Sequence, residues 1–174
     1  MATWRDVDIP CLGHIERLTG FSVPVGNRVA VISYEALHVI DLTARRIIER
    51  DETVAEGGDA YDAQTQTLHH KGISYPILGV HGGSRALLTN PLGERLAFDT
   101  SIDGPGSIVR VLHVLDADNQ APIDIHFDDF SGDWCHATFS PDGRFIVVGA
   151  PYDLLVLQRD QVMDTSGTSH WTES

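Results

Sequence analysis

Short apolar runs of strand length alternate with turns rich in Pro, Gly and Asp along most of the chain. The clearest example lies between residues 139 and 158. Its turn, Ser-Pro-Asp-Gly at 140–143, combines a proline that fixes φ, an aspartate that bonds to the backbone and a glycine that accepts positive φ. The nearly continuous apolar runs at 145–148 and 154–157 predict antiparallel strands that are covered on both faces.

Two weaker copies of this pattern lie upstream. Each copy has an apolar residue and a hydroxyl residue, then Pro-x-Gly, then an apolar strand, and the three prolines are Pro24, Pro91 and Pro141. The strand after each copy also repeats, at residues 37–42, 112–117 and 154–159. Recurrence of one such unit indicates a repeat protein.

With this order of turns and strands, the chain resembles β-propeller repeat proteins with WD40-like or YVTN-like blades. It does so without the Gly-His and Trp-Asp pairs of true WD40 repeats. The resemblance covers residues 13–51 and 83–159. It implies antiparallel, four-stranded repeats and says little about activity, because propellers host many functions.

We therefore expect an all-β fold with a single β-propeller-like domain over residues 1–160. The three clear four-stranded repeats are expected at about 13–51, 83–129 and 133–160. The prolines of the first two turns are 67 residues apart, against about 40–50 for a usual blade, so residues 51–82 are expected to be a degenerate blade or an insertion. Residues 161–174 are expected to form a polar C-terminal tail.

Two segments carry expectations about strand pairing. Residues 3–9 alternate weakly and are expected to complete the last repeat, which lacks a clear fourth strand. Residues 73–78 have strand character, and Pro76 predicts an edge position because proline cannot donate to a ladder. The repeats could close as a small ring, pair with another copy or form an open fan, and we expect a compact monomer or a homodimer.

The charge of the chain is unusual. Lys and Arg number 12 against 25 Asp and Glu, which gives a formal net charge of −13 and a pI near 4.8. Such a surface repels nucleic acid and anionic membranes and attracts basic proteins, although net negative charge also serves solubility. We therefore expect a basic protein partner, no nucleic acid and no membrane.

The rest of the composition favours a cytoplasmic protein. The chain has no apolar run long enough to span a membrane, and its first residues lack the apolar core of a signal peptide. The two cysteines, Cys11 and Cys135, cannot form a disulfide framework and are expected to be reduced thiols.

One strand carries a candidate metal site. Asp124, His126 and Asp128 alternate, so they share one face of a strand as a carboxylate–imidazole–carboxylate row that could bind a divalent cation. The alternative is an ordinary half-exposed strand whose opposite, apolar face packs inward. His69 and His70 are adjacent, so they point to opposite faces of a strand and cannot both hold one metal.

The other candidate residues favour structural roles. His38 and His113 occupy the same position in two repeats, which indicates a shared packing or hydrogen-bonding role. The sequence carries no nucleophile elbow and no phosphate-binding loop, so whether the protein is an enzyme is uncertain, with a non-enzyme favoured. We expect no cofactor.

These observations favour a non-enzymatic protein–protein interaction module whose acidic surface binds a more basic protein. An immunity or inhibitor protein that masks a basic toxin or enzyme would be one example. The alternative is a metal- or small-ligand-binding propeller with hydrolase-like activity centred on Asp124, His126 and Asp128. A sugar-binding propeller would use exposed Trp4, Trp134 or Trp171, but these three positions are not equivalent in the repeats.

Overall fold

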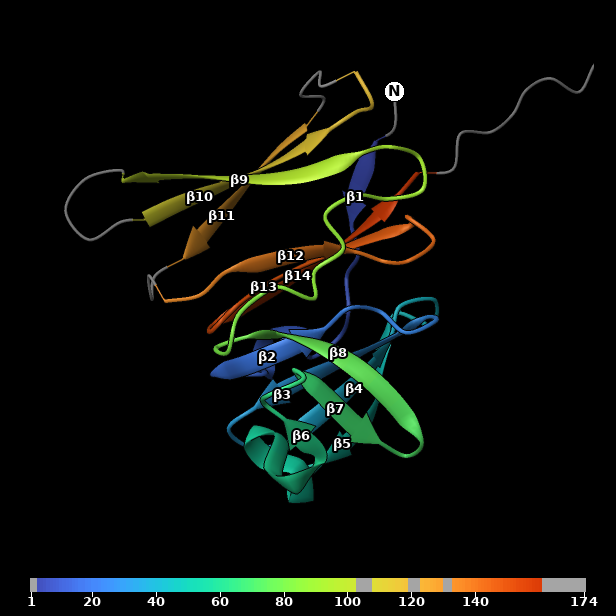
Figure 1. Ribbon diagram of the computed structural model, residues 1–174, viewed down its shortest axis with the longest axis vertical. Coiled ribbons are helices and arrows are strands. Elements are labelled where there is room, and N and C mark those ends of the chain that lie inside the picture. The colour runs from blue at the N-terminus through green and yellow to red at the C-terminus, as the bar shows by residue number, and fades with distance from the viewer. Residues whose placement is uncertain (1–2, 103–107, 119–122, 130–132, 161–174) are drawn as a thin grey trace, which may run out of the picture.

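A computed structural model describes residues 3–102, 108–118, 123–129 and 133–160 of the chain. Over these residues the fold is all-β and its sheets are antiparallel, as predicted. Three sheets lie in layers, with a four-stranded sheet between a seven-stranded and a three-stranded one (Figure 1). No helix in the described part of the chain is long and apolar enough to cross a membrane.

The seven-stranded sheet has the strand order β5-β4-β3-β2-β8-β7-β6 and curls into a half-barrel. Its strands are β2 (Leu18–Ser22), β3 (Arg28–Ser33), β4 (Leu37–Asp41), β5 (Arg46–Asp51), β6 (Tyr61–Asp62), β7 (Thr67–His70) and β8 (Ile73–Gly79). The first four form a meander within the first expected repeat. The segment η2 (Glu52–Ala60) joins β5 to β6, and its Val54 packs into the sheet.

Strands β6 to β8 extend this same sheet. β8 pairs with β7 through Ile73–Pro76 and with β2 through Ile77–Gly79, so both of its sides are used and the predicted edge position was wrong. Pro76 is tolerated because it lies at the point where β8 stops pairing with β7 and begins to pair with β2. Its carbonyl accepts a hydrogen bond from Val23 N at 2.9 Å.

The four-stranded sheet has the order β1-β14-β13-β12. Its strands are β1 (Trp4–Asp6), β12 (His136–Phe139), β13 (Phe145–Ala150) and β14 (Asp153–Arg159). β1 pairs with β14, which confirms the expected pairing of the N-terminal segment with the strand at 153–159. A short 3₁₀ segment, η1 (Leu12–His14), leads from this sheet to β2.

The three-stranded sheet has the order β11-β10-β9. Its strands are β9 (Arg95–Ile102), β10 (Ile108–Leu115) and β11 (Ile123–Asp129). A four-stranded repeat was expected here, but the segment before β9 makes only scattered hydrogen bonds. The Leu88 carbonyl accepts from Leu96 N and the Leu87 carbonyl from Phe139 N, both at 2.9 Å, so this segment joins the three-stranded sheet to β12.

Two apolar cores lie on opposite faces of β13. Phe145 and Val147 pack toward the seven-stranded sheet, whereas Ile146 and Val148 pack toward the three-stranded sheet. All four side chains are at most 2% exposed. The prediction that this strand is covered on both faces is confirmed.

The three Pro-x-Gly turns use one chemistry. In each turn a side-chain oxygen accepts the N–H of a residue in or just before the next strand: Ser22 from Ala30 at 2.9 Å, Asn90 from Glu94 at 3.0 Å and Ser140 from Phe145 at 3.0 Å. The glycines have positive φ, which side chains disfavour: Gly26 (59°), Gly93 (81°) and Gly143 (73°). The positive φ expected of the turn glycine is therefore present in all three copies, whereas the side-chain acceptor before each proline was not predicted.

Candidate functional site

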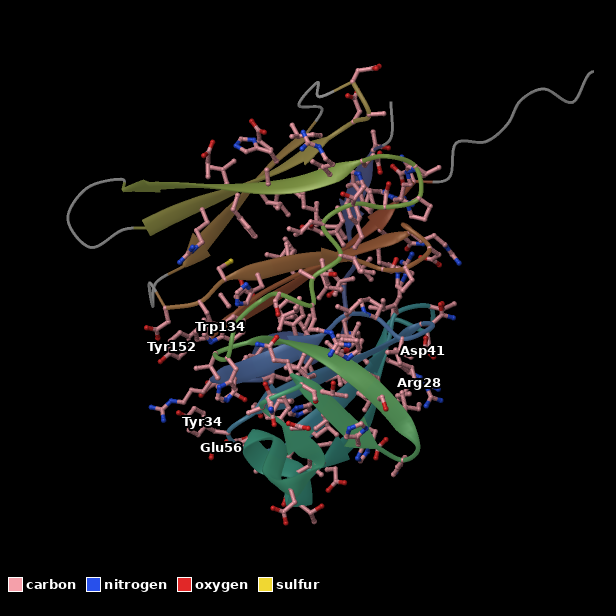
Figure 2. All side chains as sticks on the ribbon, in the orientation of Figure 1. Arg28, Tyr34, Asp41, Glu56, Trp134 and Tyr152 are labelled. Atoms are coloured by element: carbon pink, nitrogen blue, oxygen red, sulfur yellow. The ribbon has the colours of Figure 1, made fainter. Side chains whose placement is uncertain are left out.

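An aromatic cavity of about 570 Å³ lies where one end of the seven-stranded sheet meets the four-stranded sheet. Tyr34, Trp134 and Tyr152 contribute to its lining and are labelled in Figure 2. Val80 also lines it, and Arg17 and Asp133 add one charge of each sign. We call this space the aromatic cavity.

Turns from two sheets build the cavity. Tyr34 lies in the β3–β4 turn and its N–H donates to the Arg17 carbonyl at 3.3 Å, while the Arg17 guanidinium lies 5.8 Å from the centre of the Tyr34 ring. Tyr152 lies in the β13–β14 turn. That turn is tied to β2, because Leu18 N donates to the Pro151 carbonyl at 2.7 Å. These bonds hold the two tyrosines on one side of the molecule.

Trp134 forms a supported wall of the cavity. Its ring stacks with Phe21 and with His136, with centroid distances of 6.3 and 5.7 Å. His136 Nε2 donates to the Gly79 carbonyl at 3.1 Å, which places a proton on that nitrogen. Burial lowers the pKa of His136 below its ordinary value, so its neutral form is favoured.

A smaller hollow of about 210 Å³ adjoins the aromatic cavity, and we call the two spaces together the groove. The two share Thr19 and Val80, and the smaller one is also lined by Glu56 and Tyr61. The Tyr61 ring stacks on His81 at 5.5 Å, so the smaller hollow also has an aromatic lining residue.

One carboxylate, that of Asp133, lines the aromatic cavity, and another, that of Glu56, lines the adjoining hollow; we call these two residues the acidic rim. Glu16 and Asp153 are exposed sequence neighbours of lining residues, whereas the carboxylate of Glu35 lies 3.6 Å from the guanidinium of Arg50. Among the described lining residues Arg17 is the one Lys or Arg. The rim therefore favours a positively charged ligand.

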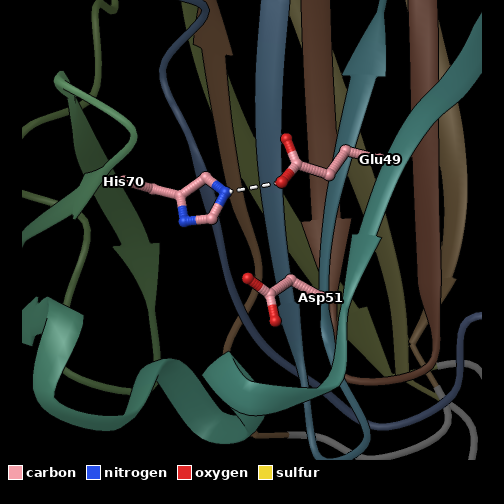
Figure 3. A group of neighbouring side chains, drawn as sticks. All are labelled: Glu49, Asp51 and His70. Carbon is pink, nitrogen blue, oxygen red and sulfur yellow. Dashed lines mark hydrogen bonds and ion pairs between the residues drawn. The ribbon is translucent and has the colours of Figure 1, made fainter.

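A second group of polar residues closes the half-barrel. The curled sheet brings β5 and β7 face to face, and Glu49 Oε1 on β5 lies 2.9 Å from His70 Nε2 on β7 (Figure 3). Lys71 Nζ lies 2.6 Å from the same carboxylate oxygen. Hydrogen bonds from Lys71 and His70 lower the pKa of Glu49. Asp51 completes the group.

The prediction that His69 and His70 point to opposite faces of a strand is confirmed. His69 Nδ1 lies 3.0 Å from Ser74 Oγ, while His70 lies against Glu49, so the two rings serve different faces. The pattern missed Glu49 and Asp51 as partners of His70, because only the curling of the sheet brings β5 to β7. Alternation along β5, where Glu49 and Asp51 are half-buried on one face, was the available signal.

Of the predicted metal row, only the Asp124 side chain lies within the described residues. Asp124 Oδ1 lies 2.5 Å from His113 Nδ1, and His113 Nε2 lies 3.0 Å from Asp99 Oδ2. Asp124, and then Asp99, raise the pKa of His113. The side chains of His126 and Asp128 lie outside the described residues, so the metal row stays a prediction.

The remaining candidates are spread over the molecule. Trp4 packs on Phe139 at a centroid distance of 6.0 Å, Trp134 lines the aromatic cavity, and Trp171 lies outside the described residues. Cys11 and Cys135 do not form a disulfide. Sequence reasoning missed Tyr34 and Tyr152, although each precedes an acidic residue in a turn between two strands, Tyr34-Glu35 in the β3–β4 turn and Tyr152-Asp153 in the β13–β14 turn.

Neither a scan against protein-family models nor a search of curated proteins found a match for this chain. Its own residues therefore carry the functional interpretation. The aromatic cavity combines exposed aromatic surface, a supported wall and a charged rim, and it offers the larger of the two spaces in the groove.

Proposed function

We propose that the protein is a non-enzymatic binding module that receives a segment of a more basic protein in the aromatic cavity. One observation carries this proposal. Among the described residues six large hydrophobic side chains are exposed, and three of them line this one space: Tyr34 (54% exposed), Val80 (59%) and Tyr152 (60%). Single exposed apolar residues are ordinary on a surface, whereas a cluster beside a hollow indicates a binding site.

The composition of the cavity supports a protein partner. Tyrosine, tryptophan and arginine dominate the energetics of protein interfaces, and they act best in a concave, desolvated centre with a polar rim. Trp134 stacks with both Phe21 and His136, so an inserted side chain would meet a surface that is already supported. Pre-ordering lowers the entropic cost of binding.

The charge of the rim supports a basic partner. The carboxylates of Asp133 and Glu56 belong to a chain with a net charge of −13, and complementary charge speeds association and selects among partners. A partner segment that carries Lys or Arg beside an apolar side chain fits both parts of the site. Masking of a basic toxin or enzyme by an immunity or inhibitor protein would be one form of this function.

We also propose that the three sheets are blades of a propeller-type arrangement. The sheet that β1 completes lies between the sheet of β2 and the sheet of β9. Closure of a ring by an N-terminal strand gives this order, because it places the last blade between the first blade and the preceding one. Apolar residues on facing sheets then pack as neighbouring blades do.

Affinity capture with matched variants tests the proposed function. A Tyr34→Ser/Tyr152→Ser double variant removes the aromatic surface, and a Leu88→Ser/Leu92→Ser double variant removes two equally exposed residues outside the cavity. We expect wild type and the leucine variant to capture the same basic protein at low salt. The tyrosine variant should bind it at least about tenfold more weakly, or about 1.4 kcal/mol.

The affinity should also fall with added salt, because the rim charges are exposed to solvent. Circular dichroism establishes that each variant is folded before capture. Equal capture by the two double variants would show that the aromatic cavity is not part of the interface. Capture that does not change with salt concentration would show that the acidic rim does not contribute to binding.

A further inference from the structure

The closure of the half-barrel gathers three potential metal ligands. Glu49 and Asp51 alternate on β5, so both side chains leave the same face of the strand. His70 reaches them from β7, near the opposite end of the strand order of the sheet. Figure 3 shows the imidazole and the two carboxylates directed into one space between these strands.

We propose that Glu49, Asp51 and His70 bind a divalent transition-metal ion of the Zn²⁺ type, which clamps the two ends of the curled sheet together. One ligand atom from each residue can be chosen so that all three atoms lie within 4.8 Å of one another. Ligand atoms at about 2.0–2.2 Å from a zinc ion lie at most about 4.4 Å apart. Small side-chain adjustments therefore suffice for coordination.

The donor set selects the class of metal. Imidazole nitrogen favours Zn²⁺ and its transition-metal neighbours, whereas Mg²⁺ prefers oxygen ligands in an octahedral shell. Two carboxylates balance the charge of a dication. Three protein ligands leave one tetrahedral position for water.

The ligands are already partly ordered. The His70 side chain is only 9% exposed and that of Glu49 23%, so both rest against the protein. Asp51 Oδ1 accepts from Thr53 N at 3.0 Å and from Thr53 Oγ1 at 2.6 Å, which fixes the carboxylate and leaves its other oxygen for a metal. Hydrogen bonds of this kind orient metal ligands in proteins.

Lys71 competes for the site. Its ammonium lies 2.6 Å from the Glu49 oxygen that also faces His70, and its side chain is 68% exposed. The ammonium can swing into solvent at little cost, so a metal ion can replace it. Replacement of Lys71 should therefore tighten metal binding, which is an effect that damage to the fold cannot produce.

Calorimetric titration of the chelator-treated full chain with zinc chloride tests the proposal. We expect one saturable zinc ion per chain, no comparable heat with magnesium chloride, and a higher thermal midpoint with zinc. His70→Gln and Asp51→Asn should each weaken zinc binding at least about tenfold. Lys71→Met should bind zinc more tightly than wild type.

Two matched controls locate the site. His69→Gln changes the adjacent histidine, whose ring lies against Ser74, and should bind zinc as wild type does. His113→Gln changes the other histidine–carboxylate group and should also leave zinc binding unchanged. No saturable heat with wild type, equal losses in His69→Gln and His70→Gln, or weaker binding by Lys71→Met would each overturn the proposal. Partner capture at the aromatic cavity is a separate measurement and does not depend on these outcomes.

Discussion

Strand β4 and the end of β10 share a nearly identical five-residue segment in different surroundings. Leu37-His38-Val39-Ile40-Asp41 and Leu112-His113-Val114-Leu115-Asp116 agree at four of five positions. In β4 both faces are covered: Leu37 and Val39 enter one core and Ile40 another. Among the described side chains of β10, Leu112 and Val114 are the ones buried in a core, and both lie on one face.

The two histidines, His38 and His113, differ accordingly in burial, in hydrogen bonding and in the direction of their pKa shifts. His38 is 7% exposed, its Nδ1 is without a hydrogen-bond partner, and burial lowers its pKa. His113 is partly exposed between Asp124 and Asp99, which raise its pKa. A repeated sequence thus specifies strand and turn, but the neighbouring layer decides what each side chain experiences. The shared role expected for the two histidines is not present.

The largest expected effect comes from truncating the equivalent residue in each strand. Ile40 is fully buried, so Ile40→Ala should lower the free energy of unfolding by about 3 kcal/mol. Leu115 is half-buried, and Leu115→Ala should cost about 1 kcal/mol or less. Urea unfolding followed by circular dichroism measures both. Equal costs would show that the outer face of β10 is covered in solution.

A smaller effect should follow from releasing the three-stranded sheet from its neighbour. Glu94, which precedes β9, is 7% exposed and pairs with Arg159 of β14 at 2.5 Å. Glu94→Gln leaves that guanidinium without its charged partner and should cost about 2 kcal/mol, less than a fully buried pair because Arg159 is partly exposed.

Hydrogen exchange sharpens this prediction. In Glu94→Gln the amides of β9 and β10 should exchange faster, while those of β13 stay protected. Asp160→Asn removes the exposed ion pair with Arg5 and should cost only about 0.5 kcal/mol. Uniform acceleration across all sheets would mean that the three-stranded sheet does not open separately.

The smallest expected effect is an opposite pH dependence at the two histidines. The pKa of His38 is lowered, so below its ordinary value of 6.5 the unfolded chain binds a proton more readily than the folded chain does. The free energy of unfolding therefore decreases as the pH falls below 6.5. The pKa of His113 is raised, so its stabilisation is complete below 6.5 and is lost as pH rises through the folded value.

Urea midpoints between pH 5 and pH 8 test this difference. His38→Leu should reduce the loss of stability at acid pH, and His113→Gln should increase it. Changes of the same sign in both variants would contradict the contrast between the two sheets.

Local elements of the fold could be predicted from the sequence, because turn residues and apolar runs act over a few positions. The Pro-x-Gly turns are an example. The pairing of β1 with β14 is not local, and it was expected because residues 133–160 lack a clear fourth strand of their own. The partners of β8 could not be predicted, since an apolar run such as Ile73–Gly79 fits either side of a sheet. Which neighbour it takes depends on contacts far apart in sequence.

The candidate sites were harder to predict for the same reason. Tyr34 and Tyr152 stand in turns, where a single aromatic residue carries no periodic signal, and Trp134 joins them only when two sheets meet. Their common Tyr-acid pair in turns between two strands was a usable signal. Glu49 and His70 become neighbours only through the curvature of a sheet, which alternation along a strand does not specify.

The pairing of β1 with β14 also sets an order of assembly during synthesis. Thr3 and Asp160 are hydrogen-bonded across 157 residues of sequence. A ribosome therefore releases β1 long before its partner exists, and the central layer is completed only after residue 159 has emerged. Until then the apolar face of the seven-stranded sheet stays uncovered. Formation of β14 therefore determines when this face is protected from aggregation.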